Sequence, residues 1–273
     1  MPGGLIGTAV TAHVPRMGIE ERAPEFQRGL IAGSKAMGEA IRGLKPDLLV
    51  LMSAHWVSTF NWYVTGQNPH KGVCIADEAP DLISGEPYSR PGDSGFAAAL
   101  VAAMKAQNIP ASVNDSPHYT WDYATWVPLH YLDPAEKLPV VTMPSVLTSD
   151  LDECKRVGRI VNAVAQHQGK RIVFVASCAL SHKVVRGPEN WPTPERIELD
   201  KKVIELLKRG DIANLESWLP EYSRLAVAEM GGRVLAAMTG ALASMAGGKP
   251  LSGIHFGSYA QSSGSGNANV LVT

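Results

Sequence analysis

Residues 48–56 read LLVLMSAHW, and this stretch decides the fold. The run from Leu48 to Met52 is apolar at every position, which is typical of a strand buried on both faces in a parallel sheet. Residues 171–177, RIVFVAS, repeat this pattern, and residues 5–11 form a third apolar run rich in β-branched side chains. Strands of this kind alternate with helices in α/β proteins, so we expect a parallel sheet covered by helices.

Outward from these strands, hydrophobic spacing predicts further elements along the whole chain. The predicted helices span 24–44, 95–107, 150–166, 194–208 with a stop at Gly210, 211–218 and 224–246. The further predicted strands span 59–65, 111–114, 139–143, 252–259 and 269–272. Residues 68–91 and 184–194 lack such spacing and are expected to be irregular segments that shape a pocket. Because the chain contains no repeat, linker or shift of composition, we predict one α/β domain over residues 1–273, with a mixed, mostly parallel central sheet flanked by helices.

The composition narrows the class of protein. Apolar residues make up 45% of the chain and charged residues 19%, as in globular proteins. The net charge of −1 and the lack of a basic stripe make nucleic acid and anionic membranes poor partners. The three cysteines form no CxxC pair, and we see neither a signal peptide nor a long apolar run. We therefore expect a soluble protein of the cytoplasm.

Histidines follow the carboxyl ends of three predicted strands. His13 comes after residues 5–11, His55 after residues 48–52, and His182 shortly after residues 171–177. Ligands of open α/β sheets bind in the crevice beyond these strand ends. Each histidine taken alone could be a polar side chain leaving the core. The three together indicate a shared site.

Glu229 is a carboxylate within the apolar stretch LAVAEMGGRVLAAM. A buried carboxylate is costly unless it is paired or bound to a metal. It could instead form a salt bridge with Arg224 or Arg233, or face solvent on a helix. Two histidines and one carboxylate are the ligand set of non-haem Fe(II) oxygenases, and the same set suits catalytic zinc. The sequence thus predicts a metal centre and leaves the choice of metal open.

Other chemistry has weaker support. Ser181 or Cys178 could be the nucleophile of a hydrolase, but the chain has no GxSxG elbow. No Gly-rich phosphate loop indicates nucleotide binding. The aromatic segment 116–132 could be core, or it could wall a pocket for an aromatic substrate. His70 and His167 lie in polar surroundings and are expected at the surface.

Several motifs, taken in order, resemble the class III, LigB-type extradiol ring-cleavage dioxygenases, and most of all the homoprotocatechuate (3,4-dihydroxyphenylacetate) 2,3-dioxygenases. The motifs are HVPRM (13–17), AHW (54–56), KGVCIADEAP (71–80), DYATWVPLHYL (122–132), ALSH (179–182), LPEY (219–222), the Glu229 segment and SSGSGNANV (262–270). The resemblance runs over nearly the whole chain. It implies the LigB-like α/β fold.

The resemblance also implies roles for particular residues. Fe(II) would be held by His13, His55 and Glu229, and His182 would be the acid–base catalyst. Tyr123 stands where many members carry a second histidine, so it becomes a candidate to donate a hydrogen bond or a proton. His118, five residues earlier, is a further catalytic candidate.

The implied reaction opens a catechol-type ring with O2 to give a muconic semialdehyde. The alternatives are cleavage of a 2-aminophenol, a zinc hydrolase, and a metal-free binding homologue on the same fold. The family further implies a homo-oligomer, and some members need a second, different subunit. A carboxylated catechol would need a cationic partner, for which Arg16, Lys183, Arg186 and Arg233 are unranked candidates.

Overall fold

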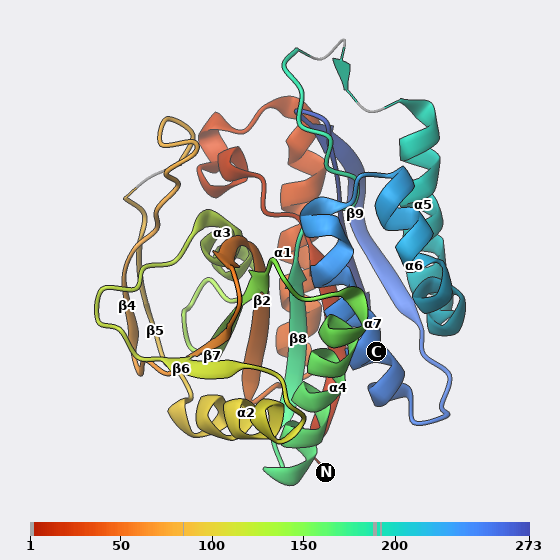
Figure 1. The fold of residues 1–273 in the computed structure, drawn as a ribbon. Coiled ribbons are helices and arrows are strands. Elements are labelled where there is room, and N and C mark those ends of the chain that lie inside the picture. Colours follow the sequence, from red (N-terminus) through yellow and green to blue (C-terminus); the bar gives the residue numbers. More distant parts are fainter. Residues whose placement is uncertain (1–2, 84, 188–189, 192) are drawn as a thin grey trace.

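The computed structural model describes residues 3–83, 85–187, 190–191 and 193–273. Its central sheet has the strand order β7-β2-β8-β1-β10-β9 (Figure 1). Strands β7, β2, β8 and β1 are parallel, whereas β10 and β9 form an antiparallel hairpin against β1. The predicted α/β class, with a mixed and mostly parallel sheet, is confirmed.

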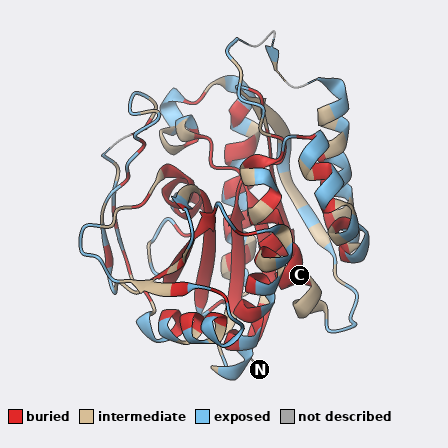
Figure 2. Cartoon of the chain, in the orientation of Figure 1, coloured by how far each residue is buried: buried red, intermediate tan, exposed pale blue. Residues whose placement is uncertain are grey.

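Burial explains why the apolar runs become central strands. In Figure 2 the strands at the centre of the sheet are buried along nearly their whole length. Leu48, Val50 and Met52 pack into the hydrophobic core on one face, and Leu49 and Leu51 pack into the core on the other. This alternation is what a strand with two covered faces requires. The strands of this sheet are β1 (Gly4–Thr11), β2 (Leu48–Ser58), β7 (Val140–Val146), β8 (Arg171–Ser177), β9 (Gly253–Ser262) and β10 (Ser265–Val272).

Helices cover both faces of the sheet. Helices α4 and α7 pack against each other and against β1, while α1 and α3 pack on the opposite face (Figure 1). Helix α5 lies over the β9–β10 hairpin and contacts α6, and α2 contacts α4. The helices are α1 (Arg28–Gly43), α2 (Ser94–Ala106), α3 (Tyr123–Leu132), α4 (Leu151–His167), α5 (Pro194–Arg209), α6 (Ile212–Leu225) and α7 (Arg233–Ala246). Within the described parts of the chain, no helix is long and apolar enough to cross a membrane.

Two short sheets flank the central one. Strands β3 (Trp62–Thr65) and β6 (Ala111–Asn114) pair in parallel, and β4 (His70–Val73) and β5 (Pro87–Arg90) pair antiparallel. The prediction that 68–91 is wholly irregular was therefore wrong, because β4 and β5 lie within it. His70 was predicted at the surface, but it is buried and its Nε2 lies 2.9 Å from the carbonyl oxygen of Val140. Burial lowers the pKa of His70.

Two predicted boundaries near the site were also wrong. Strand β2 does not end before His55 but continues to Ser58, with a shift in its pairing to β7 between Met52 and Val57. The predicted helix 224–246 is broken, because α6 extends to Leu225 and α7 starts only at Arg233. Between them lies the short 3-10 helix η5 (Glu229–Gly232), where Met230, Gly231 and Gly232 have φ values of 49°, 64° and 81°. Left-handed residues cannot continue an α-helix, so the chain turns here.

Candidate metal centre and substrate cavity

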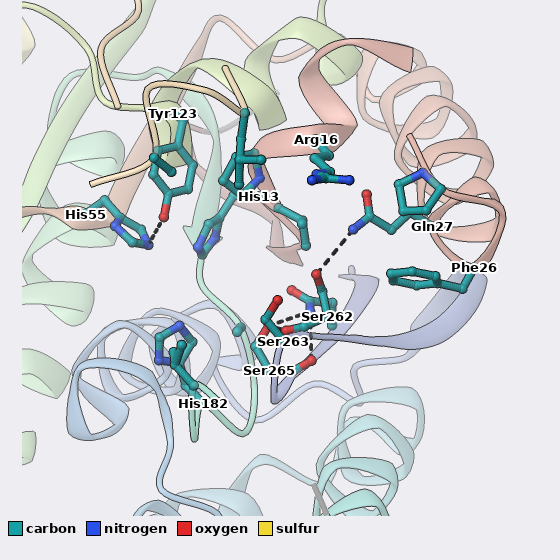
Figure 3. A pocket seen from close by; sticks show the side chains of 18 residues that line it. His13, Arg16, Phe26, Gln27, His55, Tyr123, His182, Ser262, Ser263 and Ser265 are labelled. Atoms are coloured by element: carbon teal, nitrogen blue, oxygen red, sulfur yellow. Dashed lines mark hydrogen bonds between the residues drawn. The ribbon is translucent and has the colours of Figure 1, made fainter. Parts of the chain in front are cut away.

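Four side chains far apart in the sequence meet at the carboxyl ends of the central strands. They are His13 after β1, His55 within β2, His182 after β8, and Glu229 in η5. The Nε2 atoms of His13, His55 and His182 lie 3.5, 3.4 and 3.2 Å from the same oxygen, Oε1 of Glu229. Figure 3 shows the three imidazoles gathered at one end of a cavity. The strand-end crevice predicted from the sequence is thus where these residues converge.

His13 is held by a hydroxyl on the neighbouring strand. The Ser177 hydroxyl lies 3.3 Å from His13 Nδ1 and 2.5 Å from the carbonyl oxygen of Ala124. Because that carbonyl can only accept, the hydroxyl donates to it and accepts from the imidazole, which places the His13 proton on Nδ1. The lone pair of Nε2 then faces Glu229.

His55 lies between two carboxylates and a phenol. Its Nδ1 is 2.7 Å from Glu78 Oε1, and its Nε2 is 2.8 Å from the Tyr123 hydroxyl. Burial would lower the pKa of His55, but its hydrogen bonds to Glu229 and Glu78 outweigh burial and raise the pKa to about 10. An imidazole with Nδ1–H bound to a carboxylate presents Nε2 as a ligand, the usual arrangement of a metal-bound histidine. A metal ion would take the place of the second proton.

Ser53 of β2 helps to position Tyr123. The Ser53 hydroxyl donates to Asp122 Oδ1 at 2.8 Å, and Asp122 in turn caps the start of α3 by accepting from the Thr125 amide. Tyr123 is the first residue of that helix, so its phenol is held against His55. Burial raises the pKa of Tyr123, as do the carboxylates of Glu78 and Glu229. The phenol therefore keeps its proton and can donate it in a hydrogen bond.

Glu229 is oriented by backbone contacts to the segment after β8. Its side chain is 3% exposed, and its Oε2 accepts a 2.6 Å hydrogen bond from the Ala179 amide. The Glu229 amide donates to the carbonyl of Leu180 at 3.2 Å. Burial alone would raise the pKa of this carboxyl, but the facing imidazoles, His13 first, hold it well below its ordinary value. The carboxylate is thus ionised and aims Oε1 at the histidines.

His182 is tied to the Glu229 segment on one side and to β10 on the other. Its amide donates to the carbonyl of Val227 at 2.9 Å, and it forms an isolated antiparallel bridge with Ser265. Burial lowers the pKa of His182, which favours the neutral imidazole that a general base requires. The side chain is 29% exposed, so it can reach a molecule in the cavity.

These residues fit a metal ion. His13, His55 and Glu229 offer ligand atoms within 4.8 Å of one another. The histidine–Glu229 distances of 3.4 and 3.5 Å exceed the roughly 2.7–2.9 Å of a charge-assisted hydrogen bond. They are shorter than two metal–ligand bonds of about 2.0–2.2 Å placed end to end. A metal ion between the three side chains would neutralise the charge of the buried carboxylate. Ion pairs with the histidines at the observed distances neutralise it less well.

The cavity beside the centre has a volume of about 460 Å³. Its lining residues are His13, Val14, Pro15, Arg16, Pro24, Phe26, Gln27, His55, Ala79, Leu82, Tyr123, Ala179, His182, Val184, Ser262, Ser263, Ser265 and Asn267. Volumes of this order are typical of small-molecule sites. His118 does not join them, because it is exposed on the segment before α3 and does not line the cavity.

Neither Ser181 nor Cys178 lies in surroundings that suit a hydrolase nucleophile. The Ser181 hydroxyl is buried and donates to Asp200 at 2.6 Å. Cys178 is also buried, and burial raises its pKa well above the ordinary value, so it is a thiol and a poor nucleophile. The salt bridges proposed for Glu229 with Arg224 or Arg233 are likewise replaced by contacts to histidines.

Sequence reasoning missed several residues that support the centre. Glu78 lies within the KGVCIADEAP motif, but nothing in that motif indicated a contact with His55. Ser177 is the last residue of a predicted strand, and Asp200 is an acidic residue on an amphipathic helix. The only available signal for Asp200 was its place on the buried face of the helix, where a carboxylate needs partners.

Comparisons with known proteins identify the family of this chain. The sequence profile described as "Catalytic LigB subunit of aromatic ring-opening dioxygenase" matches residues 7–269. The chain is 23% identical over 232 residues to 3,4-dihydroxyphenylacetate 2,3-dioxygenase of Escherichia coli, covering 81% of this chain and 84% of that protein. It is 25% identical over 251 residues to the 2-aminophenol 1,6-dioxygenase beta subunit of Pseudomonas sp, covering 84% of this chain and 82% of that protein.

A solved structure shows the same fold. The uncharacterized protein JW3007 of Escherichia coli K12 superposes with a TM-score of 0.67 at 18% identity, covering 98% of this chain and 99% of that chain. The profile match spans nearly the whole sequence and includes every residue of the convergent site. The chain therefore belongs to the LigB family of catalytic subunits of aromatic ring-opening dioxygenases, and its predicted place among the ring-cleaving oxidoreductases is confirmed.

Proposed function

We propose that this chain is a non-haem Fe(II)-dependent extradiol dioxygenase that cleaves 3,4-dihydroxyphenylacetate or a related catechol to a muconic semialdehyde. The observation that carries the proposal is the convergence of His13, His55 and Glu229 at the end of a cavity that also holds His182. The names of the similar proteins support ring cleavage as the reaction. Two histidines and one carboxylate favour Fe(II) in a site that uses O2.

The protein would hold the metal through preoriented ligands. Ser177 fixes the tautomer of His13, Glu78 fixes that of His55, and the Ala179 amide fixes Glu229. When bound, Fe(II) supplies the redox chemistry with O2 and a positive charge that favours a deprotonated catechol.

Proton movement falls to His182 and Tyr123. His182 would take the proton of one catechol hydroxyl and return it as the ring opens, a task that suits a neutral imidazole. Tyr123 would donate a hydrogen bond to a substrate oxygen from its position beside His55. Both atoms of O2 enter the product, so the reaction needs no other reductant. His118 is exposed and outside the cavity, which leaves the acid–base role to His182.

A second candidate substrate is a 2-aminophenol. Similar proteins include both the beta and the alpha subunit of a 2-aminophenol 1,6-dioxygenase, the alpha subunit at 27% identity over 213 residues. Those subunit names also motivate the proposal that this chain acts as an oligomer, which light scattering would test.

The first experiment loads the protein with Fe(II) without oxygen and then adds O2 with catechols or 2-aminophenol. We expect oxygen uptake and a yellow ring-fission product with at least one catechol. Protein loaded with Zn(II) is the control and should show neither oxygen uptake nor ring fission, because zinc has no redox chemistry with O2. Equal oxygen uptake with zinc and with iron would contradict the iron-dependent reaction.

A second experiment tests the ligand set without relying on activity. The variants His13→Ala, His55→Ala and Glu229→Ala should each lose bound iron, measured by metal analysis after removal of free ions. His167→Ala is the matched control, because this histidine is exposed at the end of α4 and should leave the iron content unchanged. Full iron retention in all three site variants would contradict the assignment.

A further inference from the structure

The cavity has two chemically different ends. At one end lie the histidines and Tyr123, and at the other lie Arg16, Gln27 and Ser262 (Figure 3). The far end is built by the 3-10 helix η1 (Pro15–Gly18), the turn before α1, and the tip of the β9–β10 hairpin. A substrate whose ring lies at the histidine end would place its opposite edge toward this second group.

Of the four cationic candidates, Arg16 is the one that lines the cavity. Arg233 donates to three backbone carbonyl oxygens at 2.8–2.9 Å and braces the start of α7. Lys183 and Arg186 are exposed and line a separate pocket beside α5. The fold therefore distinguishes Arg16 from the other three candidates for binding a substrate carboxylate, which the sequence alone could not do.

Arg16 is an exposed residue at the mouth of the cavity that it lines. Among the residues that the structure describes, no carboxylate oxygen lies within 4.0 Å of its guanidinium, whereas Arg28, Arg90 and Arg159 each form an ion pair with a carboxylate. A guanidinium presents N–H donors in a planar fork that matches a carboxylate. The Arg16 fork is thus free to bind an anionic group of a molecule in the cavity.

Gln27 gives an independent indication of a ligand at the same end. This residue is 1% exposed, and its Nε2 donates to the Ser262 hydroxyl at 3.2 Å. Its Oε1 is buried without any hydrogen-bond partner among the described residues. Buried polar atoms almost always have a hydrogen-bond partner. The unpaired Oε1 on the cavity wall therefore indicates that a donor approaches it when a ligand binds, either from the ligand or from a neighbouring side chain. Figure 3 shows the carboxamide between Arg16 and Ser262.

The two ends of the cavity are close together in the chain. Arg16 follows the ligand His13 by three residues, so their backbones lie at most about 10–11 Å apart. The ring of Phe26 and the side of Pro24 line the wall beside Arg16 and offer apolar contact. Both ends thus belong to one small cavity close to the ligand His13.

We propose that Arg16, with Gln27 and the Ser262 hydroxyl beside it, binds a carboxylate carried by the substrate on the edge of the ring opposite its two hydroxyls. This inference rests on the proposed ring-cleaving function and narrows its substrates to anionic catechols. Gln27 would keep the Arg16 fork in place by accepting one N–H, while the remaining donors hold the carboxylate.

The test compares two catechols that differ in this group, 3,4-dihydroxyphenylacetate and the neutral 4-methylcatechol. Equilibrium binding of each is measured without oxygen on the Fe(II)-loaded wild type, on Arg16→Gln and on Arg186→Gln. Arg186→Gln is the matched control, because it removes an exposed arginine outside the cavity. We expect Arg16→Gln to weaken binding of the carboxylated ligand about 10- to 100-fold and to leave 4-methylcatechol unchanged. In steady state the KM for the carboxylated catechol should rise while kcat stays nearly constant.

The possible failures are distinct. Equal weakening of both ligands by Arg16→Gln, or no weakening of either, overturns the carboxylate site and leaves the ring-cleaving function standing. An equal effect of Arg186→Gln also overturns it, since general charge attraction would then be the cause. If the loaded wild type binds neither catechol, the proposed function fails and the carboxylate site fails with it.

Discussion

At the scale of single residues, one oxygen atom organises the site. Oε1 of Glu229 lies 3.2–3.5 Å from three imidazole nitrogens, while Oε2 is occupied by the Ala179 amide. Because the backbone holds Oε2, the side chain cannot rotate Oε1 away from the histidines. The imidazoles differ in what holds their other nitrogens. His13 and His55 contact Ser177 and Glu78 through Nδ1, as ligands would, whereas His182 is fixed mainly through its backbone.

Because His182 is not held as a ligand would be, its replacement should affect catalysis without affecting metal binding. His182→Ala should keep its metal and bind catechol, yet lose turnover by roughly 10²–10⁴-fold, because it removes general acid–base catalysis without removing a ligand. Metal analysis and anaerobic catechol binding establish that the centre is intact, and oxygen uptake then measures the rate. A loss smaller than about tenfold would remove His182 from the acid–base role.

At the scale of elements, the break between α6 and α7 brings Glu229 into the site. A continuous helix over 224–246 would carry Glu229 along the α7 axis, away from the crevice. Instead Val227 and Met230 adopt φ values of 52° and 49° on either side of it. The Val227 carbonyl then accepts from the His182 amide, so the turn also fixes the acid–base candidate. Left-handed conformations cost most for branched side chains, and strain of this kind gathers at functional sites.

The strain at Val227 can be measured. Val227→Asn should raise the free energy of unfolding by about 1 kcal/mol, because asparagine tolerates the left-handed region far better than valine. The valine side chain is 44% exposed, so its removal costs little burial. Urea denaturation of the two proteins gives the difference directly.

A matched variant separates strain from surface polarity. Val73 is 46% exposed in strand β4 and has no positive φ, so Val73→Asn should bring no gain and a slight loss. Equal effects of the two substitutions would show that backbone strain is not the cause.

At the scale of the whole molecule, the strands were predicted well because an apolar run buried on both faces is a local signal. Residues 171–177 were predicted and form β8 with the same bounds. The histidine positions followed from those strands, since the carboxyl ends of parallel strands share one edge. The broken helix was not predicted, because apolar spacing continues through residues 226–232 and the turn depends on dihedral angles. Gly231-Gly232 was its only local sign.

Contacts between distant segments lay beyond any local pattern. Glu78 meets His55 across an irregular segment, and Asp200 in α5 meets Ser181, Tyr222 of α6 and Tyr259 of β9. None of these pairs shares a spacing rule, because each depends on how whole elements pack. The same packing decides which arginine faces the cavity, so Arg16 could be named in advance but not ranked.

The Asp200 cluster gives a prediction at this scale, because it joins α5, α6, β9 and the segment before His182. The carboxylate accepts from the amide and hydroxyl of Ser181 at 3.0 and 2.6 Å and from the phenols of Tyr222 and Tyr259 at 2.8 and 2.7 Å. Burial nevertheless raises the pKa of Asp200 above its ordinary value of 3.8, against these hydrogen bonds. The folded protein therefore holds this proton more tightly than the unfolded chain does.

From that difference the sign of the pH effect follows. Between pH 3.8 and the raised pKa the folded state binds more protons, so the stability due to Asp200 falls as the pH rises through this window. The Asn side chain of Asp200→Asn is uncharged and nearly the same shape, so this variant does not lose stability as the pH rises through the window. The free energy of unfolding of Asp200→Asn, relative to wild type, should thus become more favourable as the pH rises from 3.8 through the raised pKa of Asp200, while all other titrating groups cancel. Urea titrations of both proteins across this range measure the difference. A difference that does not grow as the pH rises through this window would mean that the hydrogen bonds outweigh burial and that the pKa of Asp200 is not raised.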